Sequence, residues 1–232
     1  MTIESEQRSA ARVAGLFYLL MMFTGLFGEL YLRSPRIVPD DAVQTAKNIA
    51  GAEHLFRLGI IAGLVTAVGD VVLLWALYVV LKPVNKNLAL LAALWRLGEC
   101  FMFGVVALNE FAALRFLSDA SYLRTFNTEQ TQALARLFLT FHHPGGQIAI
   151  VFFAFGSTLF GYLWFKSRYI PRVLSVIGIA ASVAVGASTL INLVVPNFES
   201  AVGPAYWIPI ALFEVVLGFW LLIRGIRVPQ QA

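Results

Sequence analysis

Residues 58–81 read LGIIAGLVTAVGDVVLLWALYVVL, an apolar stretch whose one charged side chain is Asp70. The hydrocarbon core of a bilayer is about 30 Å thick, and about 20 apolar helical residues are enough to cross it. A charge at membrane depth costs at least about 2.5 kcal/mol on insertion scales. The stretch therefore predicts a transmembrane helix in which Asp70 needs an explanation.

Five further runs resemble this stretch in length and composition. The complete set covers residues 13–31, 58–81, 88–114, 145–165, 173–195 and 205–223. Hydrophobic residues make up 59% of the 232-residue chain and charged residues only 13%, whereas soluble domains carry about 25% charged residues. The mean hydropathy is +0.77. The sequence predicts an all-α polytopic membrane protein with six transmembrane helices in one bundle, a single membrane domain over residues 1–232.

Lysine and arginine residues indicate the orientation of the helices, because cytoplasmic loops carry an excess of them. With the N-terminus inside, the cytoplasmic segments hold Arg8, Arg12, Lys82, Lys86, Lys166, Arg168, Arg172, Arg224 and Arg227. The opposite side holds a smaller set, Arg33, Arg36, Lys47, Arg57, Arg115, Arg124 and Arg136. We therefore expect both termini in the cytoplasm and the protein in the cytoplasmic membrane.

The composition also bears on the partners of the protein. Its net charge of +4 does not indicate nucleic acid, because the basic residues stand singly beside the spans. Such residues suit anchors that face lipid headgroups, so the lipid bilayer is the expected partner. Cys100 is the one cysteine, which excludes an intrachain disulfide and a C-x-x-C motif. A homo-oligomer is an open alternative that nothing in the sequence supports.

The segment between the first two spans carries a helix signal at residues 40–50. Asp40 follows Pro39 and is the expected N-cap, and Gly51 is the expected stop. An apolar stripe runs between them. We expect a short helix here, on the outer face of the protein.

A second short helix is predicted for residues 128–141, also on the outer face. Asn127 precedes it, and Gln130 follows three residues later, which is the spacing of a capping box. The sequence Pro144-Gly145-Gly146 is then expected to separate this helix from the fourth span.

Four charged residues fall in one slab near the membrane midplane, if each helix rises by about 1.5 Å per residue. They are Asp70, Arg96, Glu99 and Glu214, and they come from three different spans. Arg96 and Glu99 are three residues apart on one helix, so their side chains meet. We expect an arginine-centred cluster of these four residues. One guanidinium does not neutralise three carboxylates, so at least one carboxylate is expected to be protonated or exposed to water.

The cluster has two possible interpretations. A buried Arg–Glu pair often does no more than hold helices together or fix their register. Alternatively, the four residues line a polar crevice that binds or carries a small molecule, a lipid or a proton. The excess of acid over base favours the second reading, because a purely structural ion pair would be balanced.

A second polar layer is predicted near the outer membrane surface. It comprises Glu29, Glu53, His54, Arg57, Glu110, His142 and His143. Of these, Glu29, Arg57 and Glu110 are further candidates for a ligand or proton site. His54, His142 and Glu110 would suit Zn²⁺, which lowers the pKa of bound water to about 7. The sequence has no H-E-x-x-H motif, however, so no cofactor is predicted and zinc is only an alternative.

The sequence assigns no catalytic residues. It contains no glycine-rich phosphate loop, no G-x-S-x-G elbow and no recognisable nucleophile–base pair, so whether the protein is an enzyme stays open. The lead hypothesis is the ligand-binding or carrying crevice. The alternatives are a metal-dependent hydrolase at the outer leaflet and a structural or accessory subunit without a ligand.

Three groups of residues resemble the pattern of one known family. The first group resembles the first outer loop of that family and consists of Leu32-Arg33-Ser34, Asp41, Thr45-Ala46, Asn48-Ile49 and Leu55-Phe56-Arg57-Leu58-Gly59. The second group resembles the inner turn and third span of the family and consists of Lys82-Pro83-Val84-Asn85-Lys86, Leu88-Ala89-Leu90-Leu91 and Arg96-Leu97-Gly98-Glu99. The third group resembles the fourth span and second inner turn of the family and consists of Phe141-His142, Gly145, Phe152-Phe153, Gly161-Tyr162-Leu163 and Ile170-Pro171-Arg172-Val173-Leu174. The family is the multi-pass bacterial membrane group known as domain of unknown function 4386.

The resemblance extends from about Arg12 to Arg224. It implies a bacterial cytoplasmic-membrane protein with six helices, and it implies no activity. The family pattern includes residues that match Arg57, Arg96, Glu99 and His142, which favours these four as site candidates. The chain departs from the pattern after Pro171, where Ser175 and Val176 stand at positions in which a glycine is common.

Overall fold

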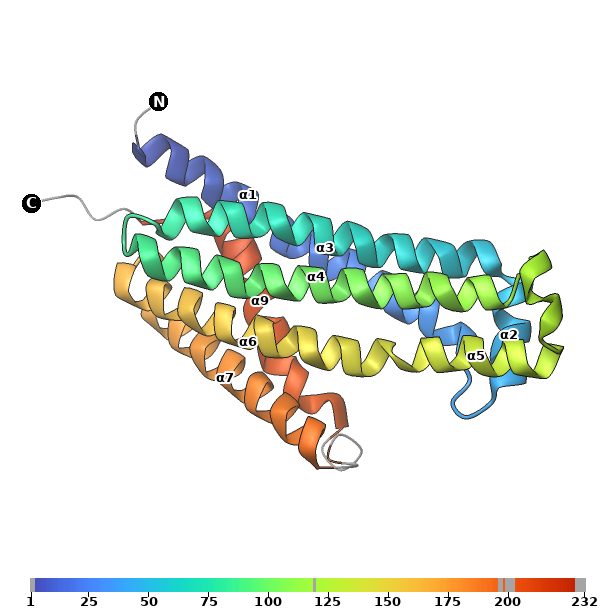
Figure 1. The fold of residues 1–232 in the computed structure, drawn as a ribbon. Helices are drawn as coiled ribbons and strands as arrows, with labels where there is room; N and C mark the ends of the chain where they lie inside the picture. The colour runs from blue at the N-terminus through green and yellow to red at the C-terminus, as the bar shows by residue number, and fades with distance from the viewer. Residues whose placement is uncertain (1–2, 119, 196–197, 199–202, 228–232) are drawn as a thin grey trace, which may run out of the picture. The chain divides into compact units, whose positions relative to one another are not determined.

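The computed structural model describes residues 3–118, 120–195, 198 and 203–227, and within these ranges it consists of helices and connecting turns without a strand (Figure 1). In this described part of the chain, six helical segments are long and apolar enough to cross a membrane. They are Ser5–Arg36, Glu53–Leu81, Lys86–Phe116, Thr128–Ser167, Arg172–Val194 and Ala205–Ile223. The predicted all-α polytopic fold with six membrane helices is confirmed.

The long helices extend beyond most of the apolar runs that predict them. They are α1 (Ile3–Phe27), α3 (Glu53–Leu81), α4 (Lys86–Phe116), α6 (His142–Ser167), α7 (Arg172–Val194) and α9 (Ile208–Ile223). An apolar run marks only the part of a helix that lies at hydrocarbon depth, and polar residues continue the helix on either side. After α1 the chain continues as a π-helix, η1 (Gly28–Arg33), and a 3₁₀ turn, η2 (Ser34–Arg36). Another 3₁₀ turn, η4 (Gly203–Trp207), leads into α9.

The short helix predicted at 40–50 is α2 (Ala42–Gly51), but its cap is Asp41 and not Asp40. The Asp41 carboxylate accepts a hydrogen bond from the Gln44 backbone N–H at 2.7 Å. Asp40 has a φ of 59°, a left-handed conformation that belongs to the turn before the helix. Because residues 40 and 41 are both Asp, the residue types alone did not show which of the two caps the helix.

The second short helix is α5 (Thr128–Thr140), and its predicted capping box between Asn127 and Gln130 is present. The prediction that Pro144-Gly145-Gly146 interrupts the helices is wrong. The break lies at Phe141, and α6 begins at His142 and runs through this tripeptide. Proline is tolerated there because the first turn of a helix has no intrahelical partner for its backbone N–H groups.

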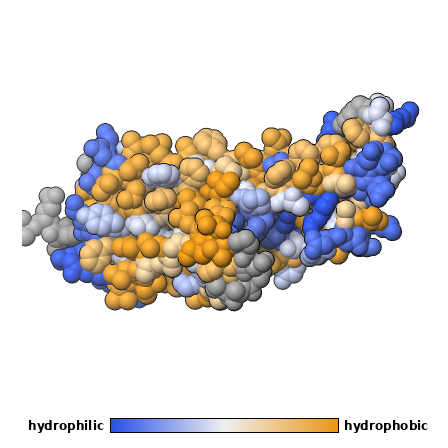
Figure 2. Space-filling model, turned by 60° about the horizontal axis from the view of Figure 1, so that its bottom comes forward, coloured by the Kyte–Doolittle hydropathy of each residue, from blue (hydrophilic) through white to orange (hydrophobic). Residues whose placement is uncertain are grey.

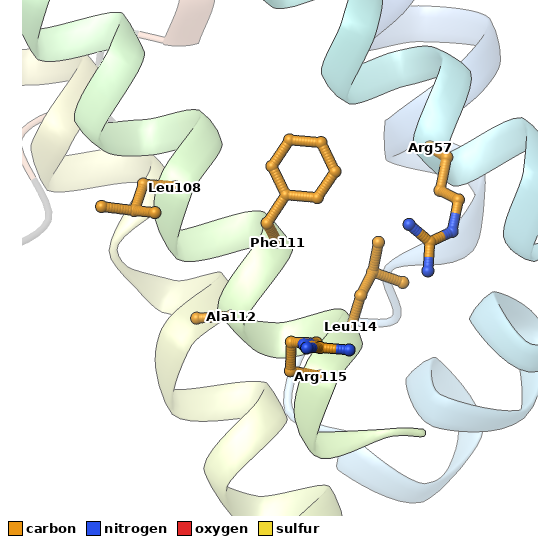
Figure 3. A pocket seen from close by; sticks show the side chains of 6 residues that line it. All are labelled: Arg57, Leu108, Phe111, Ala112, Leu114 and Arg115. Carbon is orange, nitrogen blue, oxygen red and sulfur yellow. The ribbon is translucent and has the colours of Figure 1, made fainter. Parts of the chain in front are cut away.

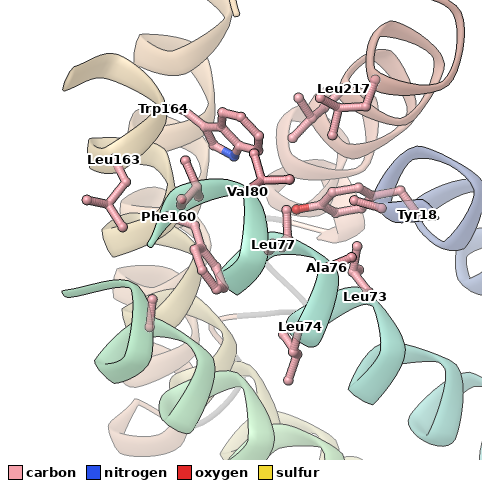
Figure 4. Close-up of a cluster of buried hydrophobic side chains, with 14 of the residues drawn as sticks. Tyr18, Leu73, Leu74, Ala76, Leu77, Val80, Phe160, Leu163, Trp164 and Leu217 are labelled. Carbon is pink, nitrogen blue, oxygen red and sulfur yellow. The ribbon is translucent and has the colours of Figure 1, made fainter. Parts of the chain in front are cut away.

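The contacts divide the chain into two compact units. Unit 1 comprises Met1–Met22, Val68–Cys100 and Gln147–Ala232, and unit 2 comprises Phe23–Ala67 and Phe101–Gly146. The core of unit 1 is formed by α1, α3, α4, α6, α7 and α9. Figure 4 shows part of it, in which Tyr18, Leu77, Trp164 and Leu217 from four helices converge.

Unit 2 has its own smaller core. Ile49 of α2, Phe56 of α3, Leu114 of α4 and Leu139 of α5 are all buried in it. The two short helices α2 and α5 therefore fold onto the ends of α3 and α4.

The outward flanks of the long helices are strongly apolar. Side chains such as Phe23, Val68, Phe101 and Val173 are largely exposed, and apolar side chains predominate on much of the face in Figure 2. In water such a surface would be unfavourable, whereas in a bilayer it faces lipid tails. The surface therefore agrees with a membrane-embedded fold.

Candidate functional site

Arg96 lies in the first half of α4 and is buried within unit 1, with only 2% of its surface exposed. Gly156 of α6 makes room for it, because a Cβ atom at position 156 would lie 2.6 Å from Arg96 Cγ. The guanidinium carbon stands 4.4 Å from the centre of the Phe153 ring, also on α6. This cation–π contact stabilises a positive charge away from water.

Three carboxylates and one hydroxyl surround this guanidinium. We call Asp70, Arg96, Glu99, Ser157 and Glu214 the Arg96 cluster. Its contacts connect α3, α4, α6 and α9, all within unit 1. The structure thus brings together all four residues that the sequence placed in the midplane slab.

The contacts of Arg96 are of two kinds. Its Nε lies 2.6 Å from Glu99 Oε2, and its Nη1 donates a hydrogen bond to Ser157 Oγ at 2.8 Å. Nη2 of Arg96 lies 3.7 Å from Asp70 Oδ1, and Nη1 lies 3.7 Å from Glu214 Oε1. At 3.7 Å the attraction is electrostatic and no hydrogen bond forms. Nε of Arg96 and Oε2 of Glu99 are close, but their angle does not give a hydrogen bond either.

The charge of the cluster is not balanced. Among the residues that the structure describes, Arg96 is the only basic side chain in ion-pair contact with these carboxylates. Three ionised carboxylates around one guanidinium would leave two negative charges in a low-dielectric region, which is strongly unfavourable. Protons or an added cation are needed to balance them. The Glu214 side chain is 18% exposed, against 9% for Asp70 and 5% for Glu99, so it is the least buried of the three carboxylates.

A second polar group, the Glu110 cluster, consists of Glu29, Arg33, Ser34, Glu110 and His142 in unit 2. Glu29 and Arg33 both lie in the π-helix η1, whose wider turn is shown by the bond from the Ser34 backbone N–H to the Glu29 carbonyl. Such π-turns are rare and occur frequently at functional sites. No feature of the sequence indicates this turn.

The Glu110 cluster forms a closed ring of alternating acidic and basic groups. Arg33 contacts Glu29 at 3.0 Å and also donates from Nε to Glu110. His142 contacts Glu110 through Nδ1 at 3.0 Å and Glu29 through Nε2 at 3.6 Å. The ring contains two carboxylates, one guanidinium and one imidazole, so its acidic and basic groups are equal in number. It therefore differs from the Arg96 cluster, in which acid is in excess.

The proposed zinc ligands do not form one group in the structure. Glu110 and His142 are in contact, but His54 takes no part in their ring, and Arg33 contacts the same Glu110 oxygen as His142. Over the described ranges, no set of three or more His, Cys, Asp or Glu side chains is placed as a metal site. Zinc binding stays only an alternative, and these contacts do not supply a ligand set for it.

Arg57 lies outside both clusters. It is half exposed and forms an ion pair with Glu53, one turn earlier on α3, at 2.7 Å. It also lines a pocket in unit 2 together with residues of α4.

Sequence reasoning missed Arg33, Ser34, Ser157 and Phe153. Arg33 was detectable in principle, because it stands four residues after Glu29 on a continuing helix. Ser157 and Phe153 had no signal in the sequence, since a serine or phenylalanine in an apolar helix usually packs.

Comparison with known proteins identifies a family and a distant relative. The family model "Domain of unknown function (DUF4386)" matches residues 13–225. A relative from Archaeoglobus fulgidus, described as an uncharacterized protein, is 23% identical over 167 residues, which cover 69% of this chain and 80% of the relative. No solved structure matches. Because the family match covers residues 13–225 of the 232-residue chain, the chain belongs to the family described as Domain of unknown function (DUF4386).

Proposed function

We propose that the Arg96 cluster binds and releases protons at membrane depth and that the protein carries protons through it. The observation that supports this is the surplus of carboxylate around a single buried guanidinium. A balanced structural ion pair would not need Asp70 and Glu214 in addition to Glu99. Intramembrane carboxylates that face the interior of a bundle are typical of proton pathways.

Among the ligands that the sequence left open, a proton fits the geometry best. The separations of 3.7 Å between Arg96 and the carboxylates of Asp70 and Glu214 are too short to hold an organic molecule between the charges. A proton binds to a carboxylate without displacing its neighbours. In this proposal Arg96 supplies a fixed positive charge, Glu214 exchanges protons with the outside, and Asp70 and Glu99 accept them further inside.

The first test is Glu214→Gln, which removes the exchangeable proton and keeps the size of the side chain. The purified protein is reconstituted into liposomes that contain a pH-sensitive dye, and a membrane potential is imposed. We expect wild-type protein to transport protons and Glu214→Gln to lose at least nine-tenths of the flux, about a tenfold change. Glu129→Gln is the matched control, because Glu129 is exposed in the first turn of α5 and should transport as wild type does.

A second readout separates binding from carrying. Infrared spectra of the reconstituted protein report the carbonyl band of protonated carboxylic acids as the pH is changed. Wild type should gain this band on acidification, and Glu214→Gln should gain less of it. If Glu214→Gln matches wild type in both flux and titration, the cluster is a structural ion pair and the proposal is wrong.

We propose in addition that the protein lies in the cytoplasmic membrane of a bacterium with both termini in the cytoplasm. The support is the distribution of Lys and Arg, which favours the segments around 82–87 and 166–172 as inner turns. Alkaline phosphatase fused after Ala232 should be inactive, because the enzyme folds only in the periplasm, whereas a fusion at Asn127 should be active. The reverse pattern would show the opposite orientation.

A further inference from the structure

A pocket of about 360 Å³ in unit 2 shares no lining residue with the Arg96 cluster or with the Glu110 cluster. It is lined by Arg57 of α3 and by Leu108, Phe111, Ala112, Leu114 and Arg115 of α4. In Figure 3 the Arg57 side chain extends from α3 toward α4, where Leu114 and Arg115 lie across from it. The lining of the pocket thus combines two guanidinium groups with a wall of apolar side chains.

The polar and apolar parts of this pocket are separated along the helix axis. Arg115 lies in the last turn of α4, and Arg57 lies in the second turn of α3, so both stand near helix ends. Leu108 precedes Arg115 by two helical turns, about 10 Å deeper toward the middle of the span. Leu108 is also 68% exposed, so its side chain is available to an acyl chain. This order of charge and hydrocarbon matches that of a lipid molecule in a bilayer.

The charges of the pocket match a single anion. Arg57 is paired with Glu53, but both side chains are about half exposed, and pairs of this kind contribute little. No acidic partner contacts Arg115 in the described part of the chain. Glu53, Arg57 and Arg115 together carry one positive charge. A phosphodiester carries one negative charge and accepts paired hydrogen bonds from guanidinium groups.

We propose that this pocket binds one anionic phospholipid, with its phosphate between Arg57 and Arg115 and an acyl chain along Leu108, Phe111 and Ala112. The occupant is a lipid and not a soluble phosphate, because four of the six lining residues are apolar and the pocket lies on membrane-spanning helices. The ligand would belong to the leaflet in which the start of α3 and the end of α4 emerge.

The test measures lipid retention by native mass spectrometry of the full-length protein from nanodiscs that hold equal amounts of phosphatidylglycerol and phosphatidylcholine. Wild type should retain phosphatidylglycerol at least tenfold over phosphatidylcholine. Arg115→Gln and Arg57→Gln should each lower this preference about tenfold, the change expected on losing a charge-assisted hydrogen bond. Arg124→Gln is the matched control, because Arg124 is an exposed arginine of unit 2 that does not line the pocket.

Two outcomes would overturn the proposal. One is equal retention of both lipids, or a preference that neither arginine variant changes. The other is competition by glycerol phosphate at the concentration of the lipid, which would show a soluble-anion site without a role for the apolar wall. Because neither arginine belongs to the Arg96 cluster, both variants should keep wild-type proton flux, so this test and that of the proton pathway can fail independently.

Discussion

Arg96→Met is expected to lower the free energy of unfolding by about 3–5 kcal/mol, the usual effect of removing one partner of a buried ion pair. Methionine fills a similar volume but leaves Glu99, Asp70 and Glu214 without their positive neighbour and Ser157 without its donor. The measurement is chemical unfolding of the detergent-purified protein at neutral pH, followed by tryptophan fluorescence. The variant should also fail to carry protons.

The physical cause of this loss can be isolated in two ways. The double variant Arg96→Met/Glu99→Gln should be more stable than Arg96→Met alone, because it buries one unpaired charge fewer. The deficit of Arg96→Met should also shrink as the pH falls, since protonation removes the negative charges that the arginine balanced. A deficit that is independent of pH and unchanged in the double variant would mean that packing, and not charge, determines the effect.

The sequence was sufficient for the membrane helices and for the four charged members of the Arg96 cluster. Long apolar runs have one physical solution in a bilayer, because backbone N–H and C=O groups must be paired within the segment. The depth of Asp70, Arg96, Glu99 and Glu214 followed from helical rise alone, and charged residues at the same depth in neighbouring helices have few alternatives to meeting one another. Their contacts in unit 1 follow this reasoning.

What the sequence did not predict depends on local backbone geometry and on packing partners. The ring of Glu29, Arg33, Glu110 and His142 requires the π-turn at Gly28–Arg33, and no simple periodicity distinguishes a π-turn from an α-helix that continues. The break at Phe141 was misplaced because a Pro-Gly-Gly sequence is typical of a turn and equally compatible with a helix start. The participation of Ser157 is set by where α6 lies against α4.

Gly15→Leu is expected to destabilise unit 1 by about 3 kcal/mol, the upper part of the range for overpacking. An added Cβ at position 15 would lie 2.5 Å from the backbone nitrogen of Leu222 and 2.7 Å from the carbonyl oxygen of Gly218. Both are backbone atoms of α9, so no rotamer change relieves the overlap, and α1 and α9 must separate. Small residues at such positions are what allows membrane helices to approach closely.

The same separation should impair function, because α9 carries Glu214. Displacing this helix would lengthen the 3.7 Å distance between Glu214 and Arg96, so Gly15→Leu should lower both the unfolding midpoint and the proton flux in liposomes. Gly63→Leu is the matched control: it lies inside α3, a Cβ there meets no atom within 4 Å, and the change removes a flexible residue from a helix. Gly15→Ala should fall between wild type and Gly15→Leu. Equal stability of the leucine variants at positions 15 and 63 would contradict the close approach of α1 and α9. It would also contradict the argument that the packing of α1 against α9 holds Glu214 near the Arg96 guanidinium.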